Sequence, residues 1–305
     1  MRVPHPHRFQ SHITRHQDTL RVLLSCPDRP GIVATVSRFF FEREGNIVDL
    51  QEYTTKPRGG LLLMRVEVEM PGLKERAAGL EHDFAILGAE WEMHWRFERP
   101  SRLKRMAIFV SKADHCLLEL LYQWRAGDLV AEIPMIISNH EDCRSLADVH
   151  GVPFHHIPIE PSPEAKLRAE QTQLTLLGHG PHAVDLIVLA RYMQILSPEF
   201  VAHFPCRIIN IHHSFLPAFV GSNPYARAYE RGVKLIGATS HYVTEELDEG
   251  PIIEQDVERV NHRDRVEDLR RIGRDIERNV LARAVRWHLE DRILVHGKRT
   301  VIFGR

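Results

Sequence analysis

Three polar residues in two distant stretches carry the clearest chemical signal of this chain. Asn210 and His212 lie in the run IINIHHSFLPAF, and Asp248 lies in HYVTEELDEGPII. The apolar residues before Asn210 predict a buried strand, and side chains two positions apart on a strand point to the same face. An amide can steady a developing oxyanion, an imidazole can move protons, and a carboxylate can orient imidazole or water. Brought together, these groups could support nucleophilic attack on a carbonyl group.

Length and charge limit the number of domains and the kinds of partner that the chain can have. Its 305 residues are too many for one small module, which predicts two domains. A hydrophobic content of 43 % supports sizeable cores, and 40 Lys and Arg against 41 Asp and Glu leave no basic excess for nucleic acid. No apolar run reaches membrane length, and the first residues lack the apolar core of a signal peptide. We therefore expect a cytoplasmic protein without nucleic-acid or membrane partners, opened by a tail over residues 1–18.

The cysteines and histidines follow no metal-binding or redox spacing. Four cysteines are widely scattered, and the twenty histidines contain no HExxH pattern. The adjacent pairs His155–His156 and His212–His213 would point to opposite faces of a strand, so neither pair chelates an ion together. We expect no metal and no cofactor. The four cysteines are Cys26, Cys116, Cys143 and Cys206.

Residues 19–97 carry the pattern of a small α/β module. Four strand-like runs and two helical segments follow one another in the order β-α-β-β-α-β, which predicts a ferredoxin-like sheet backed by two helices. The last run alternates apolar and polar residues from Trp91 to Phe97, as a half-buried strand does. Gly45 suits the left-handed position that follows a helix end.

The remaining chain reads as a polar linker and a larger domain. Residues 98–105 form the linker, and residues 106–305 alternate strands and helices. The strands are continuous apolar runs, as expected when both faces of a sheet are covered. This predicts an open, largely parallel, Rossmann-like sheet, in which ligands collect at the carboxyl ends of the strands. Asp264 with Glu267 three residues later resembles a capping box, which predicts the start of the last long helix.

The larger domain resembles the folate-dependent formyltransferase family. That family carries an Asn-x-His strand, a downstream Ser-x-Leu-Pro and a distant Asp in an E-L-D-x-G turn, and this chain has Asn210, His212, Ser214, Leu216, Pro217, Glu246, Leu247, Asp248 and Gly250. The run LARYMQILSPEF resembles the family loop that borders the pterin ring. The resemblance implies that Asn210, His212 and Asp248 are catalytic. It implies substrate binding by Arg191, Met193, Ile195, Leu196, Val243, Glu246 and Gly250, although Met193 and Ile195 could also be core residues at a helix start.

One branch of that family fits better than the others. Members that use phosphoribosylglycinamide have a glycine-rich phosphate loop after the first strand, whereas this chain has VSKADHCLLELL, without glycine. The sequence is therefore similar to the formyltetrahydrofolate deformylase branch. This implies hydrolysis of 10-formyltetrahydrofolate to tetrahydrofolate and formate, which supplies formate for purine synthesis and balances the one-carbon folate pools. One departure is Ala226 in NPYARAY, where the family usually has histidine; Arg227 is the candidate replacement.

The run CPDRPGIVATVSRFFFEREGNI resembles an ACT domain, a regulatory module that often binds amino acids. Its turns match at Asp28, Gly31 and Asn46, and backbone N–H groups at a helix start can receive a carboxylate. The resemblance implies a glycine or methionine effector near these three residues, and a homo-oligomer, since such modules commonly pair. A purely architectural pairing module remains the alternative.

Three other functions stay open from the residues alone. The chain could transfer the formyl group to an amine instead of water. It could be an amino-acid-sensing or scaffold protein with a decayed catalytic domain, for which Ala226 is the single supporting feature. It could also be a metal hydrolase.

Overall fold

The computed structural model describes residues 8–56, 58–178, 180, 183–217 and 224–304, which form two compact units. One unit runs to Leu103 and also takes in Glu290–His296 and the residues from Val301; the other contains Lys104–Leu289 and Gly297–Thr300. Residues 106–305 were all predicted to belong to the larger domain. The C-terminal residues group with the N-terminal unit because Leu294 and Phe303 pack against Leu23 and Leu63.

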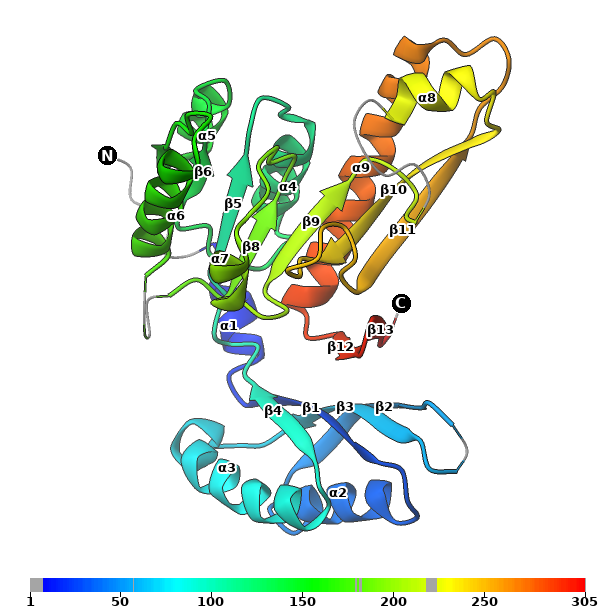
Figure 1. Cartoon of the computed structure of the whole chain (residues 1–305). Helices are drawn as coiled ribbons and strands as arrows, with labels where there is room; N and C mark the ends of the chain where they lie inside the picture. The colour runs from blue at the N-terminus through cyan, green and yellow to red at the C-terminus, as the bar shows by residue number, and fades with distance from the viewer. Residues whose placement is uncertain (1–7, 57, 179, 181–182, 218–223, 305) are drawn as a thin grey trace. The chain divides into compact units, whose positions relative to one another are not determined.

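The N-terminal unit has the expected β-α-β-β-α-β order (Figure 1). Its four strands form an antiparallel sheet in the order β2-β3-β1-β4, which confirms the ferredoxin-like prediction. A short helix within the expected tail precedes the first strand. The last strand begins at His94 rather than Trp91, because the second helix of the motif continues to Glu90 and Trp91 caps it. The elements are α1 (Gln10–Arg15), β1 (Thr19–Pro27), α2 (Ile32–Phe41), β2 (Asn46–Thr54), β3 (Leu61–Glu69), α3 (Leu73–Glu90) and β4 (His94–Glu98).

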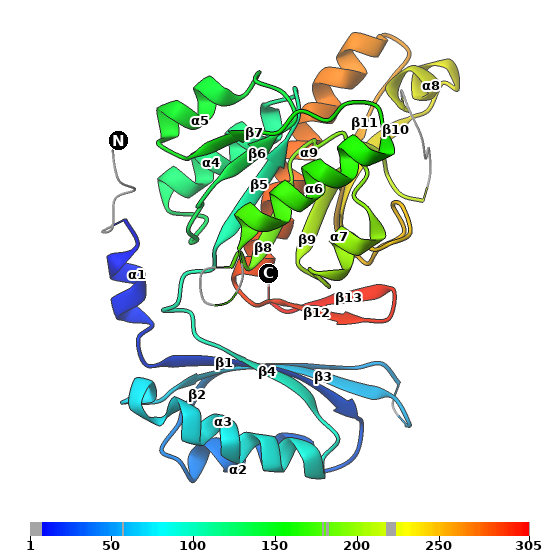
Figure 2. The same ribbon diagram turned by 60° about the vertical axis from the view of Figure 1, so that its left-hand side comes forward.

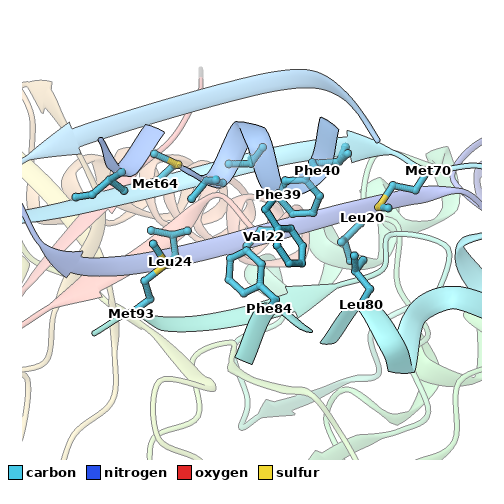
Figure 3. Packing of buried hydrophobic residues seen from close by; sticks show 14 of the residues in the cluster. Leu20, Val22, Leu24, Phe39, Phe40, Met64, Met70, Leu80, Phe84 and Met93 are labelled. Atoms are coloured by element: carbon cyan, nitrogen blue, oxygen red, sulfur yellow. The ribbon is translucent and has the colours of Figure 1, made fainter. Parts of the chain in front are cut away.

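Aliphatic side chains and a group of aromatic rings fill the core between this sheet and its two helices (Figure 3). Phe84 of α3 is completely buried and lies at the centre of the cluster. Its ring meets Phe39 edge-on at 5.0 Å and Trp95 at 4.9 Å between ring centroids. Such pairs add about 0.5–1.5 kcal/mol beyond the burial of their area. The ring of Phe84 therefore connects the aromatic residues of both helices with those of β4.

Gly45 has a different role from the one its position suggested. The residue with left-handed backbone after α2 is Glu44, with φ of 60°, while Gly45 is not in that region. A Cβ atom on Gly45 would lie 2.9 Å from Cγ1 of Val68 on β3. Glycine is required here by the close approach of the chain to the sheet, so the prediction of a left-handed glycine was wrong.

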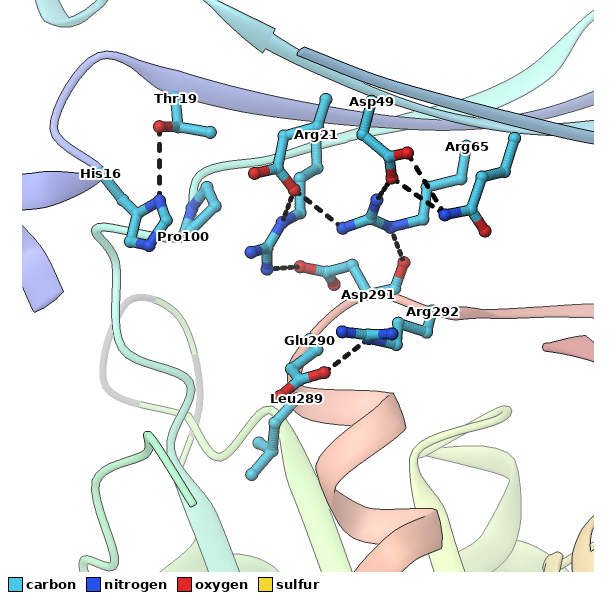
Figure 4. A network of polar contacts seen from close by, with 12 residues as sticks. His16, Thr19, Arg21, Asp49, Arg65, Pro100, Leu289, Glu290, Asp291 and Arg292 are labelled. Atoms are coloured by element: carbon cyan, nitrogen blue, oxygen red, sulfur yellow. Dashed lines mark hydrogen bonds and ion pairs between the residues drawn. The ribbon is translucent and has the colours of Figure 1, made fainter. Parts of the chain in front are cut away.

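The opposite face of the N-terminal sheet carries a network of charged residues (Figure 4). Arg65 binds Asp49 at 2.8 Å and Glu67 at 2.9 Å, and Arg21 also binds Glu67 at 2.9 Å. Burial opposes ionisation of Glu67, but the two arginines outweigh it and lower its pKa. Arg65 also donates to the backbone oxygen of Asp291 at 3.0 Å. The network thus attaches the C-terminal segment to the sheet of this unit.

The larger unit is an α/β layer structure built on a seven-stranded sheet (Figures 1 and 2). The strand order is β11-β10-β9-β8-β5-β6-β7; the strands from β9 to β7 are parallel, while β10 and β11 are antiparallel to their neighbours. This confirms the largely parallel, Rossmann-like fold. The elements are β5 (Met106–Val110), α4 (His115–Ala126), β6 (Ile136–Ser138), α5 (Arg144–His150), β7 (Phe154–His156), α6 (Pro163–Leu177), β8 (Leu186–Leu189), α7 (Pro198–Ala202), β9 (Ile208–His212), α8 (Pro224–Glu230), β10 (Leu235–Tyr242), β11 (Ile252–Arg259) and α9 (Val266–Leu289). A separate ribbon pairs β12 (Ile293–His296) with β13 (Arg299–Ile302).

Two helical layers cover this sheet. Residues of α6 and α7 pack on one face together with Ile208 and Leu189. On the other face, α9 packs against β9 to β11, and α4 packs against α9. Ile208, Asn210 and His212 alternate along β9 and therefore face the α6–α7 layer. Of the helices that the structure describes, none is long and apolar enough to cross a membrane.

Helix α9 begins two residues later than the capping-box prediction placed it. The carboxylate of Asp268 accepts from the backbone N–H of Arg265 at 3.0 Å, while Asp264 accepts from Asn261. The reciprocal pair of Asp264 and Glu267 is not formed. The acidic side chain that accepts a backbone N–H at the start of the helix is therefore Asp268, one position after the expected Glu267.

Candidate active site

The pairing of two strands sets the first contact of the site. In the antiparallel ladder of β9 and β10, Asn210 stands opposite His241. The Asn210 amide Nδ2 lies 3.3 Å from His241 Nε2, and His241 Nδ1 lies 2.9 Å from the backbone oxygen of Tyr242. Because a carbonyl oxygen only accepts, Nδ1 carries the proton, and Nε2 of the neutral ring accepts from Asn210. One N–H of the Asn210 amide is thereby used, and its second N–H is left for a ligand.

Asp248 joins two histidines from neighbouring strands. Its carboxylate lies 3.3 Å from His212 Nδ1 and 3.6 Å from His241 Nε2. The hydrogen bond from His212 Nδ1 holds the pKa of Asp248 well below its ordinary value, against the opposing effect of burial. Asp248 has a left-handed backbone, with φ of 59°, as functional residues in turns often do. The three residues predicted from the sequence therefore meet at one place.

His212 has one ring nitrogen left for chemistry. The residue is 7 % exposed, and its Nε2 has no hydrogen-bond partner among the described residues. Since Nδ1 faces the carboxylate of Asp248, the neutral ring carries its proton there and presents a lone pair at Nε2. A buried polar atom without a partner is uncommon and suits a group that exchanges protons with a ligand.

These residues open onto a cavity of about 710 Å³ at the carboxyl ends of the strands. This size and mixed lining are typical of a small-molecule site. Nine of the ten predicted catalytic and substrate-binding residues line it, namely Asn210, His212, Asp248, Arg191, Met193, Ile195, Leu196, Val243 and Glu246. Met193 is 59 % and Ile195 60 % exposed, so they are not core residues. Glu246 also pairs with Lys298 at 3.2 Å.

Gly250, the tenth predicted residue, does not line the cavity. A Cβ atom there would lie 1.7 Å from the backbone oxygen of Tyr242. The chain crosses so closely because the Tyr242 N–H donates to the Pro251 oxygen at 2.9 Å. Gly250 thus allows the turn that carries Asp248 to return against β10, which is a shaping role and not a contact with a ligand.

Buried polar side chains fix the loop after β8. The Ser111 hydroxyl accepts from the Met193 N–H at 3.0 Å and donates to Asn139 Oδ1 at 2.7 Å. Further along, Glu170 of α6 accepts from the Ser197 N–H at 2.9 Å. Ser111 and Asn139 are therefore supports for the cavity wall, and Asn139 does not itself reach the cavity.

A second cluster on the cavity wall, centred on Glu277 of α9, was not predicted from the sequence. Glu277 is 1 % exposed, and its carboxylate binds His115 Nε2 at 2.8 Å and the Tyr225 hydroxyl at 2.7 Å. Arg191 Nε lies 3.4 Å away, an ion pair too poorly aligned to count as a hydrogen bond. Burial opposes ionisation, but these partners lower the pKa of Glu277. The sequence did hold one indication of this cluster. Glu277 is an acidic residue that falls among the apolar residues of the last helix, four positions after Gly273.

His115, Cys116 and Glu277 place three possible metal-ligand atoms within 4.8 Å of one another. The donor set does not suit a divalent ion. Both oxygens of Glu277 are already bound, by His115 and by Tyr225, and the Arg191 side chain would repel a cation. Burial also raises the pKa of the Cys116 thiol well above its ordinary value, which disfavours the thiolate form that binds metals.

The departure at Ala226 falls on the same cavity. Ala226 of α8 lines it, beside Tyr225, whereas Arg227 is not among the lining residues. Arg227 is therefore not placed to replace the histidine that the resemblance predicts at 226. Residues 218–223, which include part of the motif before it, lie outside the described residues.

The three predicted effector residues do not all lie together within one chain. Gly31, with φ of 100°, caps α2, and Asp28 accepts from Thr54 at the end of β2. Asn46 begins β2, eight residues before Thr54. At about 3.4 Å per residue, the two ends of that strand are roughly 27 Å apart. Asp28 and Gly31 are neighbours, and Asn46 is at the opposite end of the sheet.

Comparisons with known proteins agree with this architecture in both units. A family model described as formyl transferase matches residues 104–285, and one described as ACT domain matches residues 20–76. A formyltetrahydrofolate deformylase of Bacillus subtilis is 54 % identical over 297 residues, covering 97 % of this chain and 98 % of that protein. The chain belongs to the formyltetrahydrofolate deformylase family.

Solved structures place the chain within that family in three dimensions. A formyltetrahydrofolate deformylase of Pseudomonas syringae matches with a TM-score of 0.88 and 44 % identity, over 98 % of this chain and 99 % of that one. A phosphoribosylglycinamide formyltransferase of Anaplasma phagocytophilum matches with a TM-score of 0.60 and 30 % identity, over 67 % of this chain and 96 % of that one. The similarity to a deformylase thus extends over both units, while the similarity to the transferase is limited to about two thirds of the chain.

Proposed function

We propose that the protein hydrolyses 10-formyltetrahydrofolate to tetrahydrofolate and formate, with Asn210, His212 and Asp248 as its catalytic residues. Membership of the deformylase family supports the reaction. The convergence of the amide, the unpartnered His212 Nε2 and the carboxylate on one cavity is the single observation that supports the residue roles. Formate made in this way would supply purine synthesis and balance the one-carbon folate pools.

In the proposed mechanism, water attacks the formyl carbon and negative charge grows on the formyl oxygen. The second N–H of the Asn210 amide donates to that oxygen, while the first is held by His241. A donor aimed at the charge of the transition state contributes about 3 kcal/mol to lowering the barrier. His241 is a positioning residue, because it acts on the reaction through Asn210.

His212 carries the proton between water and the leaving group. Asp248 holds Nδ1–H, so Nε2 can take a proton from the attacking water and deliver it to the folate nitrogen as the C–N bond breaks. An imidazole ring can accept a proton and later donate it, which are the two steps required here. Burial and the nearby Arg191 lower the pKa of His213 to about 4, so that residue is neutral and less suited to the role.

The experiment that tests this function measures formate release from 10-formyltetrahydrofolate in the absence of any amine. Wild-type protein is expected to release formate and tetrahydrofolate in equal amounts. Asp248→Ala should abolish release while the circular dichroism spectrum stays unchanged. A wild-type protein that releases formate only when an amine is added would instead be a transferase, and full activity in Asp248→Ala would remove the assigned role.

We further propose that an amino acid such as glycine or methionine regulates the enzyme through the N-terminal unit. Asp28 and Gly31 adjoin the start of α2, where free backbone N–H groups suit a carboxylate. Because Asn46 begins the other end of β2, one ligand can contact all three residues only if a second copy of the chain supplies Asn46. The effector site and a homo-oligomer are therefore one linked proposal.

Calorimetry with glycine and with methionine tests this second proposal. Wild-type protein should bind one of them, and Asn46→Ala and Asp28→Ala should both weaken that binding. Light scattering should give a multiple of the 35.3 kDa chain mass. A monomer that binds neither amino acid would leave the unit with an architectural role.

A further inference from the structure

We propose that the cluster of Glu277, His115, Tyr225 and Arg191 closes the acceptor side of the cavity, and so restricts the formyl acceptor to water. This proposal rests on the proposed function, because it concerns which molecule accepts the formyl group. The larger unit shares its fold with a formyltransferase, so the fold alone does not exclude an amine from the cavity.

Glu277, His115 and Tyr225 lie on a different wall from the predicted folate contacts Met193 and Ile195, and Arg191 reaches them from the loop after β8. Asn210 and His212 face the α6–α7 layer, and the exposed apolar residues Met193 and Ile195 belong to the loop that follows β8. Glu277, by contrast, projects from α9 on the other face of the sheet. His213, one position beyond His212, turns to that second face, where its ring lies 6.3 Å from that of Tyr225. One cavity therefore joins a folate side and an α9 side across the ends of the strands.

The α9 side is filled by side chains that hold one another in place. Glu277 binds His115 and Tyr225 through different oxygens and has Arg191 within 3.4 Å. Helix α9 is shaped for this: a Cβ atom on Gly273 would lie 2.0 Å from the Tyr225 hydroxyl, so glycine makes room for the ring. Arg191, which faces the carboxylate, has a left-handed backbone with φ of 62°, a conformation that clusters at functional sites. A buried, paired carboxylate with three partners is costly to break, which makes the wall rigid.

A transferase needs this space. The phosphoribosylglycinamide formyltransferase of Anaplasma phagocytophilum, which matches the larger unit, must by its name admit a substrate far larger than water. With folate bound against Met193 and Ile195, as the proposed function has it, a second substrate would have to enter from the α9 side. The side chains of Tyr225 and His115 line that side of the cavity, next to the small side chain of Ala226.

The two outcomes differ only in the attacking atom. In hydrolysis, the water oxygen bonds to the formyl carbon, the bond from carbon to the folate nitrogen breaks, and that nitrogen takes a proton. In transfer, the nitrogen of a primary amine makes the new bond, loses a proton, and the same folate nitrogen takes one. The product then is an N-formyl amine and no formate is released. The ratio of the two products therefore reports which acceptor reaches the carbon.

The test uses the full-length protein with 10-formyltetrahydrofolate and glycinamide as a small amine probe. Formate and N-formylglycinamide are both quantified for wild type, Tyr225→Ala, His115→Ala and Tyr225→Phe. Tyr229→Ala is the matched control, since Tyr229 is on the same helix, is 49 % exposed and does not line the cavity. Circular dichroism checks the fold of each variant.

Wild type, Tyr229→Ala and Tyr225→Phe, which keeps the ring, should give formate alone. Tyr225→Ala and His115→Ala should raise the share of N-formylglycinamide by roughly tenfold or more, in the range that the wall of a pocket provides by size exclusion. If Tyr225→Ala does not fold, His115→Ala decides the matter. Folded alanine variants that release only formate, or that lose both products in the same proportion, would overturn the proposal. Wild-type protein that makes no formate would instead refute the proposed function.

Discussion

Replacement of Asn210 by alanine is the sharpest test of the proposed chemistry. The amide Nδ2 is held by His241 at 3.3 Å, which aims its second N–H into the cavity, and alanine removes the donor with little change to the strand. Loss of one such donor costs about 3 kcal/mol of transition-state stabilisation. At about 1.36 kcal/mol per tenfold change, kcat should fall by roughly two orders of magnitude.

The same experiment separates a catalytic role from a binding role. Because charge develops on the formyl oxygen only in the transition state, kcat should fall while KM changes less than about threefold. Gln194→Ala is the matched control, since it removes an amide from the folate side of the same cavity and should alter mainly KM. Formate release at saturating and limiting substrate gives both constants. A raised KM with unchanged kcat in Asn210→Ala would show that the amide binds substrate and does not stabilise an oxyanion.

Three further substitutions test the supporting structure. The hydrogen bond from His212 lowers the pKa of Asp248, so the contribution of this carboxylate to stability is present above the ordinary carboxyl pKa of about 3.9 and is lost as pH falls toward the lower folded value. The difference in Tm between wild type and Asp248→Asn should therefore be greatest above pH of about 5 and shrink below pH of about 4, and a constant difference would contradict this. Gly250→Ala should displace the turn, lower stability by about 1–3 kcal/mol and reduce formate release by more than tenfold, as measured by thermal melting and activity, because its Cβ meets the Tyr242 oxygen. Phe84→Ala should lower the free energy of unfolding by about 3–5 kcal/mol in urea titrations followed by tryptophan fluorescence, to which Trp95 beside Phe84 contributes, and a loss below about 1 kcal/mol would show that the aromatic cluster repacks.

Sequence reasoning predicted the parts of the site that depend on local pattern. Alternation along one strand places Asn210 and His212 on the same face, and polar residues after apolar strands mark the end of a parallel sheet where ligands collect. The approach of Asp248 to His212 came from resemblance, because two distant stretches meet only through the sheet. The strand register that sets His241 opposite Asn210 is likewise a tertiary property, and the ladder between β10 and β11 shifts between Ser240 and His241.

The α9 side of the cavity was missed for a different reason. An apolar stripe on a helix predicts burial, and a glutamate within it looks like an error in the pattern unless its partners are known. Its partners are His115 at the start of α4, Arg191 in the loop after β8, and Tyr225 in α8. No regular spacing along the sequence connects these three residues to Glu277. Gly45 shows the same limit, since the contact with Val68 that requires glycine joins a helix end to a strand.

The two histidines beside Asp248 have different roles because different groups fix their rings. His241 donates through Nδ1 to the Tyr242 oxygen, which fixes its Nε2 as an acceptor for the Asn210 amide. His212 turns its Nδ1 to Asp248, which leaves its Nε2 without a protein partner. Asp248 contacts both rings, so loss of its charge would disturb the oxyanion donor and the proton carrier together. The effects of Asn210→Ala and Asp248→Asn on kcat should therefore not be additive: the double variant should lose less activity than the product of the two single losses.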